Sequence, residues 1–176
     1  MKFEYIPVPK SNKTKKIATC FFFAGLILFV LGGVKMIPFS SVIQFAAVAA
    51  FTTSILLVGR FLLRSYAYRI EDMGEGDEFI VDEITRGGRY SVCRLELTKL
   101  CSVRKRSELS KEEQSKKHYN YCPDAFASDS YVLEFIESSY DITAERIRVR
   151  IQPDEKLLSM LTDAAKANAE AQNENE

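Results

Sequence analysis

The chain has 176 residues, 47% of them hydrophobic, and its 24 basic residues balance its 24 acidic ones. This length suits two membrane spans and one soluble domain of about 100 residues, but not two large domains. The charges are segregated: residues 1–16 carry five lysines and one acid, whereas acidic residues outnumber basic ones from Arg60 onward. That acidic balance, without interleaved aromatic and basic residues, argues against nucleic acid as a partner.

Two apolar stretches follow the basic N-terminal segment. Ile17–Val34 and Met36–Gly59 contain no charged residue, and each is long enough to cross a bilayer as a helix. Both are apolar on every side rather than along one stripe, unlike surface helices of soluble proteins. No small-x-small cleavage site precedes Lys35, so a cleaved signal peptide is disfavoured. The sequence predicts transmembrane helices at 17–34 and 42–63 and a short external turn at 35–41.

The lysines and arginines predict the orientation of this hairpin. Five lysines precede the first stretch, and Arg60, Arg64 and Arg69 come at or after the end of the second. The connecting turn offers only Lys35. Because basic residues beside spans stay on the cytoplasmic side, we expect a multi-pass plasma-membrane protein with cytoplasmic N- and C-termini.

The hydrophobic pattern changes after the hairpin from continuous to alternating. Alternation begins at Tyr66, and short β-rich segments separated by turns predict about seven strands in hairpins. Pro153 and the acids after it predict the start of a helix whose apolar face carries Leu157, Leu158 and Leu161. The sequence therefore predicts a mainly-β domain at 64–169 closed by this helix, and a polar disordered tail at 170–176.

Two segments of this domain carry a resemblance to a known family. The string RLELTKLCSVRK (Arg94–Lys105) is similar to the stretch that follows the first hairpin in bacterial pleckstrin-homology-like (PH-like) domains. The ending RIRVRIQPDEKLLSML (Arg146–Leu161) resembles that family's last strand and covering helix. The resemblance implies a bent sandwich or open barrel with a C-terminal capping helix behind an N-terminal transmembrane hairpin. The charged insertion Arg106–Lys117 departs from the family pattern and leaves the fifth strand's alignment open.

The sequence offers little catalytic chemistry. It contains one histidine, His118, and neither a phosphate-binding glycine loop nor a nucleophile elbow. Cys93, Cys101, His118 and Cys122 are the candidate ligands for a metal-binding sensor, but their spacing lacks the short Cys-x-x-Cys knuckle of zinc sites. We expect buried free thiols instead, and we predict neither enzymatic activity nor a cofactor or resident metal.

Basic residues are the better functional candidates. Anionic lipids attract clusters of bases beside a membrane span, and the domain begins almost directly after the second span. The residues predicted to bind lipid are Lys13, Lys15, Lys16, Arg104, Lys105 and Arg106. The expected role is binding or scaffolding at the cytoplasmic membrane face, through anionic lipid, a protein partner or a second copy of the chain.

A structural subunit of a larger membrane complex is the alternative to this role. Small residues on the second span would allow close helix contact in such a complex. They are Ala46, Ala47, Ala49, Ala50 and Gly59.

Overall fold

The computed structural model describes residues 2–9, 11–34, 39–74, 76–137 and 145–173. These residues form two compact units. The hairpin unit comprises Pro9–Arg64 and Asp124–Phe126, and the β unit comprises the remaining segments, Met1–Val8, Ser65–Pro123 and Ala127–Glu176.

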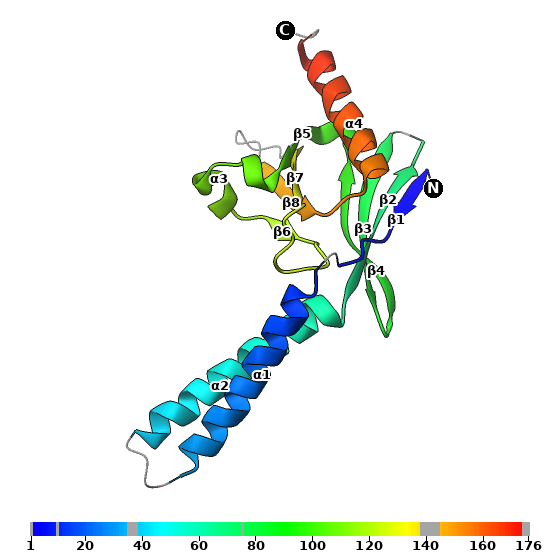
Figure 1. The fold of residues 1–176 in the computed structure, drawn as a ribbon. Helices are drawn as coiled ribbons and strands as arrows, with labels where there is room; N and C mark the ends of the chain where they lie inside the picture. Colours follow the sequence, from blue (N-terminus) through cyan, green and yellow to red (C-terminus); the bar gives the residue numbers. More distant parts are fainter. Residues whose placement is uncertain (1, 10, 35–38, 75, 138–144, 174–176) are drawn as a thin grey trace. The chain divides into compact units, whose positions relative to one another are not determined.

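The hairpin unit contains two long apolar helices, which lie side by side (Figure 1). They are α1 (Lys13–Gly32) and α2 (Ser40–Leu57), and α2 continues into a π-helical turn at Val58–Leu62. The first helix begins four residues earlier than predicted, so Lys13, Lys15 and Lys16 are helical. Most of the predicted turn, residues 35–38, lies outside the described residues.

The β unit contains two sheets and a C-terminal helix. The first sheet has the order β1-β2-β3-β4 with every neighbouring pair antiparallel. Its strands are β1 (Phe3–Tyr5), β2 (Ser65–Asp72), β3 (Asp77–Thr85) and β4 (Gly88–Glu96). The second sheet has the order β5-β7-β8-β6. Its strands are β5 (Leu100–Lys105), β6 (Tyr119–Asn120), β7 (Tyr131–Glu137) and β8 (Glu145–Ile151).

The strand predictions are largely confirmed, with one omission. The described residues contain eight strands rather than about seven, because β1 lies inside the segment that the sequence assigns to a basic N-terminal tail. Phe3 pairs with Ile70 and Tyr5 pairs with Tyr68 across the β1–β2 ladder. Three residues are too few for alternation to be recognised.

Side chains from both sheets and from α4 (Glu155–Asn173) form one core. Leu157 and Leu161 of α4 are fully buried in it, together with Phe79 and Phe135 from the two sheets. Farther along α4, the Asn168 amide donates to the carbonyls of Leu97 (2.7 Å) and Leu100 (2.9 Å). The predicted closing helix is therefore confirmed.

The two ends of α4 differ in detail from the prediction. Asp154 caps the helix, since its carboxylate accepts a hydrogen bond from the backbone N–H of Leu157 (2.9 Å). Pro153 therefore stands before the helix rather than at its first position. The helix continues to Asn173, so residues 170–173 are helical rather than a disordered tail; residues 174–176 lie outside the described residues. Five alanines between Ala164 and Ala171 give the last part of α4 a high helix propensity.

A network of charged side chains spans all four strands of the first sheet. The buried Asp82 of β3 accepts hydrogen bonds from Ser91 (2.7 Å) and Arg89 (2.6 Å) of β4 and pairs with Arg69 of β2 (2.7 Å). Arg89 also pairs with Glu4 of β1 (2.6 Å). Burial alone would raise the pKa of Asp82, but the hydrogen bonds from Ser91, Arg69 and Arg89 lower it overall.

Candidate functional site

The surface of the hairpin unit is unusually apolar. Both helices are long and apolar enough to cross a membrane, judged by length and composition alone. Large side chains such as Phe23, Ile27, Phe45 and Ile55 leave more than half of their surface uncovered. An apolar surface this extensive marks a site of contact with lipid or protein.

Four polar side chains of the hairpin donate hydrogen bonds to its own backbone carbonyls. The Gln44 amide donates to the carbonyl of Gly32 (3.0 Å), and the Ser54 hydroxyl donates to that of Ala18 (2.9 Å). Thr52 and Thr53 donate to carbonyls four residues earlier in α2. Internal pairing of this kind is what a hydrocarbon environment requires, because it supplies no water to satisfy polar groups.

Glycine permits the close approach of the two helices. A Cβ atom added at Gly32 would lie 2.7 Å from the Cγ of Gln44, and one at Gly25 would lie 3.1 Å from the Phe51 ring. The small residues of the second apolar segment, α2 and the π-helical turn after it, differ in burial. Ala47 and Ala50 are buried, whereas Ala46 and Ala49 are exposed and Gly59 is half-buried.

The first three predicted lipid-binding residues lie together at the start of α1. Lys13, Lys15 and Lys16 are exposed, and the first turn of this helix contains no acid. Within the described part of the chain, no ion pair involves any of the three. Their positive charges are therefore available to anionic groups.

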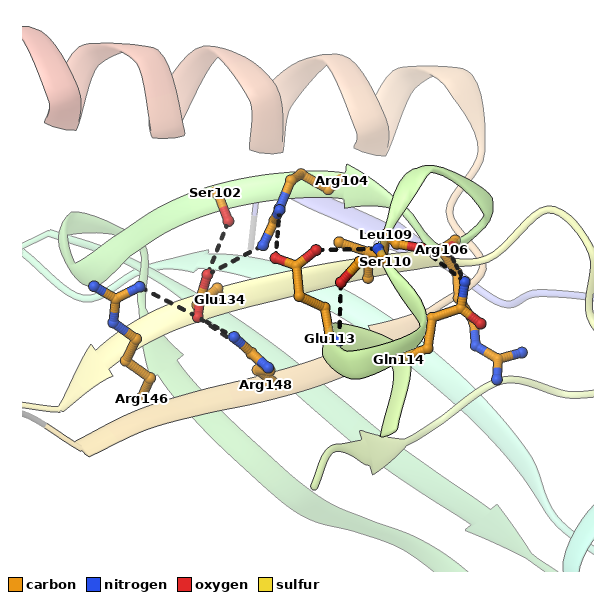
Figure 2. A network of polar contacts seen from close by, with 10 residues as sticks. All are labelled: Ser102, Arg104, Arg106, Leu109, Ser110, Glu113, Gln114, Glu134, Arg146 and Arg148. Atoms are coloured by element: carbon orange, nitrogen blue, oxygen red, sulfur yellow. Dashed lines mark hydrogen bonds and ion pairs between the residues drawn. The ribbon is translucent and has the colours of Figure 1, made fainter. Parts of the chain in front are cut away.

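The other three predicted residues have different surroundings. Arg104 pairs with Glu113 (2.9 Å) and Glu134 (3.7 Å), as Figure 2 shows, so this guanidinium is already engaged within the β unit. Lys105 is half-buried, and so is Arg106, whose carbonyl accepts from the Gln114 amide (3.2 Å). The three consecutive bases thus do not form one exposed patch.

Glu134 is the centre of this arginine cluster on the second sheet. Its buried carboxylate pairs with Arg148 (2.8 Å) and Arg146 (3.5 Å) of β8 and accepts from Ser102 of β5 (3.4 Å) (Figure 2). Burial alone would raise the pKa of Glu134, but hydrogen bonding and charge from Arg148 and Arg146 lower it overall. This cluster was not predicted from the sequence, although alternate arginines in RIRVRI place their side chains on one face of a strand.

The charged insertion after β5 is ordered by local hydrogen bonds. It contains the short helix α3 (Lys111–Ser115), which begins with a capping box. The Ser110 hydroxyl accepts from the backbone N–H of Glu113 (3.2 Å), and the Glu113 carboxylate accepts from that of Ser110 (3.1 Å). Because Glu113 also pairs with Arg104, the insertion is attached to the arginine cluster (Figure 2).

The candidate metal ligands do not come together. In the described segments, no three His, Cys, Asp or Glu side chains are placed to hold a metal ion. Cys122 is buried, whereas Cys101 and His118 are only partly covered. Burial raises the pKa of Cys93 to about 11, which disfavours the thiolate that a zinc ligand or nucleophile requires.

A small pocket opens in the β unit between the end of β4 and the second sheet. Its volume is about 180 Å³, and its apolar part is formed by Leu95, Phe135 and Ile147. Arg94 and Lys99 contribute charge to its lining. Small-molecule sites are usually larger, about 300–1,000 Å³, so this pocket does not suggest a substrate site.

Comparisons with known proteins add no relative. No family model matches the chain, and no curated protein or solved structure matches it.

Proposed function

We propose that this chain is a membrane-anchored binding or scaffolding protein whose helical hairpin spans the bilayer and whose β unit works at the cytoplasmic face. The observation that supports it best is the hairpin itself. Its outer surface is apolar, while Gln44, Thr52, Thr53 and Ser54 all donate to carbonyls inside it. A hydrocarbon environment suits both properties.

The connectivity of the first sheet supports the proposed topology. The hairpin is inserted between β1 and β2, which pair directly through Tyr5 and Tyr68. Only two residues separate the end of the second helical segment at Leu62 from β2 at Ser65. Both ends of the hairpin therefore attach to one sheet and must lie on one side of the membrane. The lysines before α1 make that side cytoplasmic.

The order of elements in the β unit supports the PH-like assignment. A four-stranded antiparallel meander is followed by an antiparallel set, β5-β7-β8, and by a covering helix. Two sheets followed by a covering helix support the proposed bent sandwich. The short β6 pairs in parallel with β8 and follows the inserted segment Arg106–Lys117. In this fold the β unit is a platform for binding rather than for catalysis.

Anionic lipid headgroups are the proposed ligands of the exposed lysines on α1. Lys13, Lys15 and Lys16 carry this proposal, because they are exposed and lie beside the apolar span. Each base near an anionic surface contributes about 1 kcal/mol of attraction. Lys105 and Arg106 are secondary candidates, whereas Arg104 stabilises the arginine cluster.

Retention of lipid during purification tests this proposal. The protein purified in mild detergent should retain anionic lipid, and a variant carrying Lys13→Gln, Lys15→Gln and Lys16→Gln should retain much less. A matched variant carrying Lys111→Gln, Lys116→Gln and Lys117→Gln controls for net charge. Equal retention in all three proteins would remove lipid as the ligand. Stoichiometric co-purification of other membrane proteins would instead favour a subunit of a complex.

A further inference from the structure

The turn Asp124–Phe126 is attached to the first turn of α1. The chain on either side of it belongs to the β unit, but the turn itself belongs to the hairpin unit. The buried Asp124 carboxylate accepts hydrogen bonds from the Thr14 hydroxyl and from the backbone N–H of Phe126 (3.0 Å). The Thr14 hydroxyl accepts in turn from the backbone N–H of Ala125 (3.2 Å).

The start of α1 gives this attachment an electrostatic reason. The residue before the helix, Asn12, makes no side-chain cap, and the first turn contains lysines but no acid. A helix N-terminus carries a partial positive charge that favours a nearby carboxylate. Asp124 supplies the acid that α1 lacks in its own sequence. Thr14 is buried beneath the turn, so the contact is closed to solvent.

The attached turn presents a large apolar side chain. Phe126 is 51% exposed, although Asp124 and Ala127 beside it are buried. Thr14 lies three residues before Ile17, where the apolar stretch begins, which corresponds to about 5 Å along the helix axis. In the proposed topology, a residue at that height lies at the boundary between headgroups and acyl chains, where apolar side chains are stabilised.

We infer that Phe126 is an interfacial anchor, inserted among the lipids of the cytoplasmic leaflet and held there by the Thr14–Asp124 contact. The inference rests on the proposed function, since it requires α1 to span the membrane. It adds a second element, distant in sequence from the spans, that binds lipid. The occupant of this surface is therefore lipid rather than a protein partner.

The chain contains no tryptophan, so Phe126→Trp introduces a single probe into the full-length protein. The protein is reconstituted in vesicles whose lipids carry bromine, a collisional quencher, either near the glycerol or near the end of the acyl chains. The emission of Phe126→Trp should shift to shorter wavelength and be quenched more by the shallow bromine than by the deep one. Adding Thr14→Val to this variant should reduce the quenching and shift the emission back.

Phe29→Trp, an exposed position in the last turn of α1 and inside its apolar stretch, reports on insertion of the hairpin itself. If Phe29→Trp is quenched while Phe126→Trp emits as in water, the anchor is refuted and the membrane hairpin stands. If neither is quenched, the proposed function fails and the anchor with it. Should Phe126→Trp misfold, Phe126→Cys carrying a polarity-sensitive fluorophore gives the same comparison. An environment as polar as that of the same label on Ser128→Cys would then refute the anchor.

Discussion

The pairing of β1 with β2 makes a quantitative prediction about the N-terminal segment. Phe3 and Tyr5 are half-buried and pack against the core, and the Tyr5 ring lies 6.2 Å from that of Tyr68. Lys156 of α4 lies 5.2 Å from the centre of the Phe3 ring. If these residues were only a basic tail beside the membrane, their aromatic side chains would contribute nothing to the stability of the β unit.

The expected loss follows from the surface that these rings bury. A fully buried aromatic contributes about 1.5–3 kcal/mol, so two half-buried rings together contribute roughly 1.5–3 kcal/mol. The double variant Phe3→Ala, Tyr5→Ala should therefore lower the unfolding free energy by about that amount. At about 4 °C per kcal/mol for a domain of this size, the midpoint temperature should fall by roughly 6–12 °C.

Thermal unfolding of the full-length protein in detergent, followed by near-ultraviolet circular dichroism of the tyrosines, measures this loss. The matched control is Ile6→Ala, an apolar residue next to β1 that is 47% exposed. Its effect should stay within about 0.5 kcal/mol, as for other surface substitutions. If the double variant unfolds at the temperature of the control, β1 does not belong to the folded unit, and the topology argument built on it fails.

Three further predictions concern the closing helix, the charge network and the topology. Leu161→Ala removes a fully buried side chain and should lower the unfolding free energy by about 2–5 kcal/mol. Leu158 is only half-buried, so Leu158→Ala should lower it by less. Equal losses for the two variants in denaturant titrations would contradict the packing of α4. The pKa of Asp82 is lower in the folded protein than in the unfolded chain. The ionised carboxylate therefore contributes its full stabilisation to the fold above the unfolded-state pKa, and this contribution is lost as the pH falls through the folded-state pKa. Asp82→Asn should therefore be less stable than the parent protein at pH 7, and it should lose less stability than the parent below about pH 4. If the unfolding free energies of the two proteins fell equally with pH, the Asp82 network would not contribute as described. In intact cells, an impermeant thiol reagent should label Ser41→Cys more strongly than the parent protein, whereas Ser128→Cys should show no increase. The reverse labelling pattern would indicate the opposite topology.

Much of the β unit was predictable because its strands alternate over several residues. The segments Tyr131–Ile136 and Arg146–Ile151 were recognised as a hairpin, and they are strands β7 and β8. The edge strand near Tyr119 and the closing helix were recognised as well. In these segments local periodicity and tertiary packing agree.

The omissions have a common physical cause. Strand β1 depends on a partner, β2, that lies beyond the whole hairpin in sequence, and three residues carry no periodicity of their own. The pairing of Arg104 with Glu113 and Glu134 likewise depends on how two segments meet in space. A run of basic residues in a sequence therefore shows where positive charge lies, but it does not show which of these residues pair with acidic partners.

The insertion of the hairpin between β1 and β2 also has a consequence for biosynthesis. At about 5–20 residues per second, the ribosome completes β1 some 3–12 s before β2 begins, and both spans are made in that interval. The first sheet can close only if β1 has stayed on the side where β2 later emerges. In the proposed topology, a chain whose N-terminus had crossed the bilayer would leave β2 as an unpaired edge of the sheet, which is prone to aggregation. In the proposed membrane topology, the first sheet therefore forms only when both ends of the hairpin lie on the same side of the bilayer.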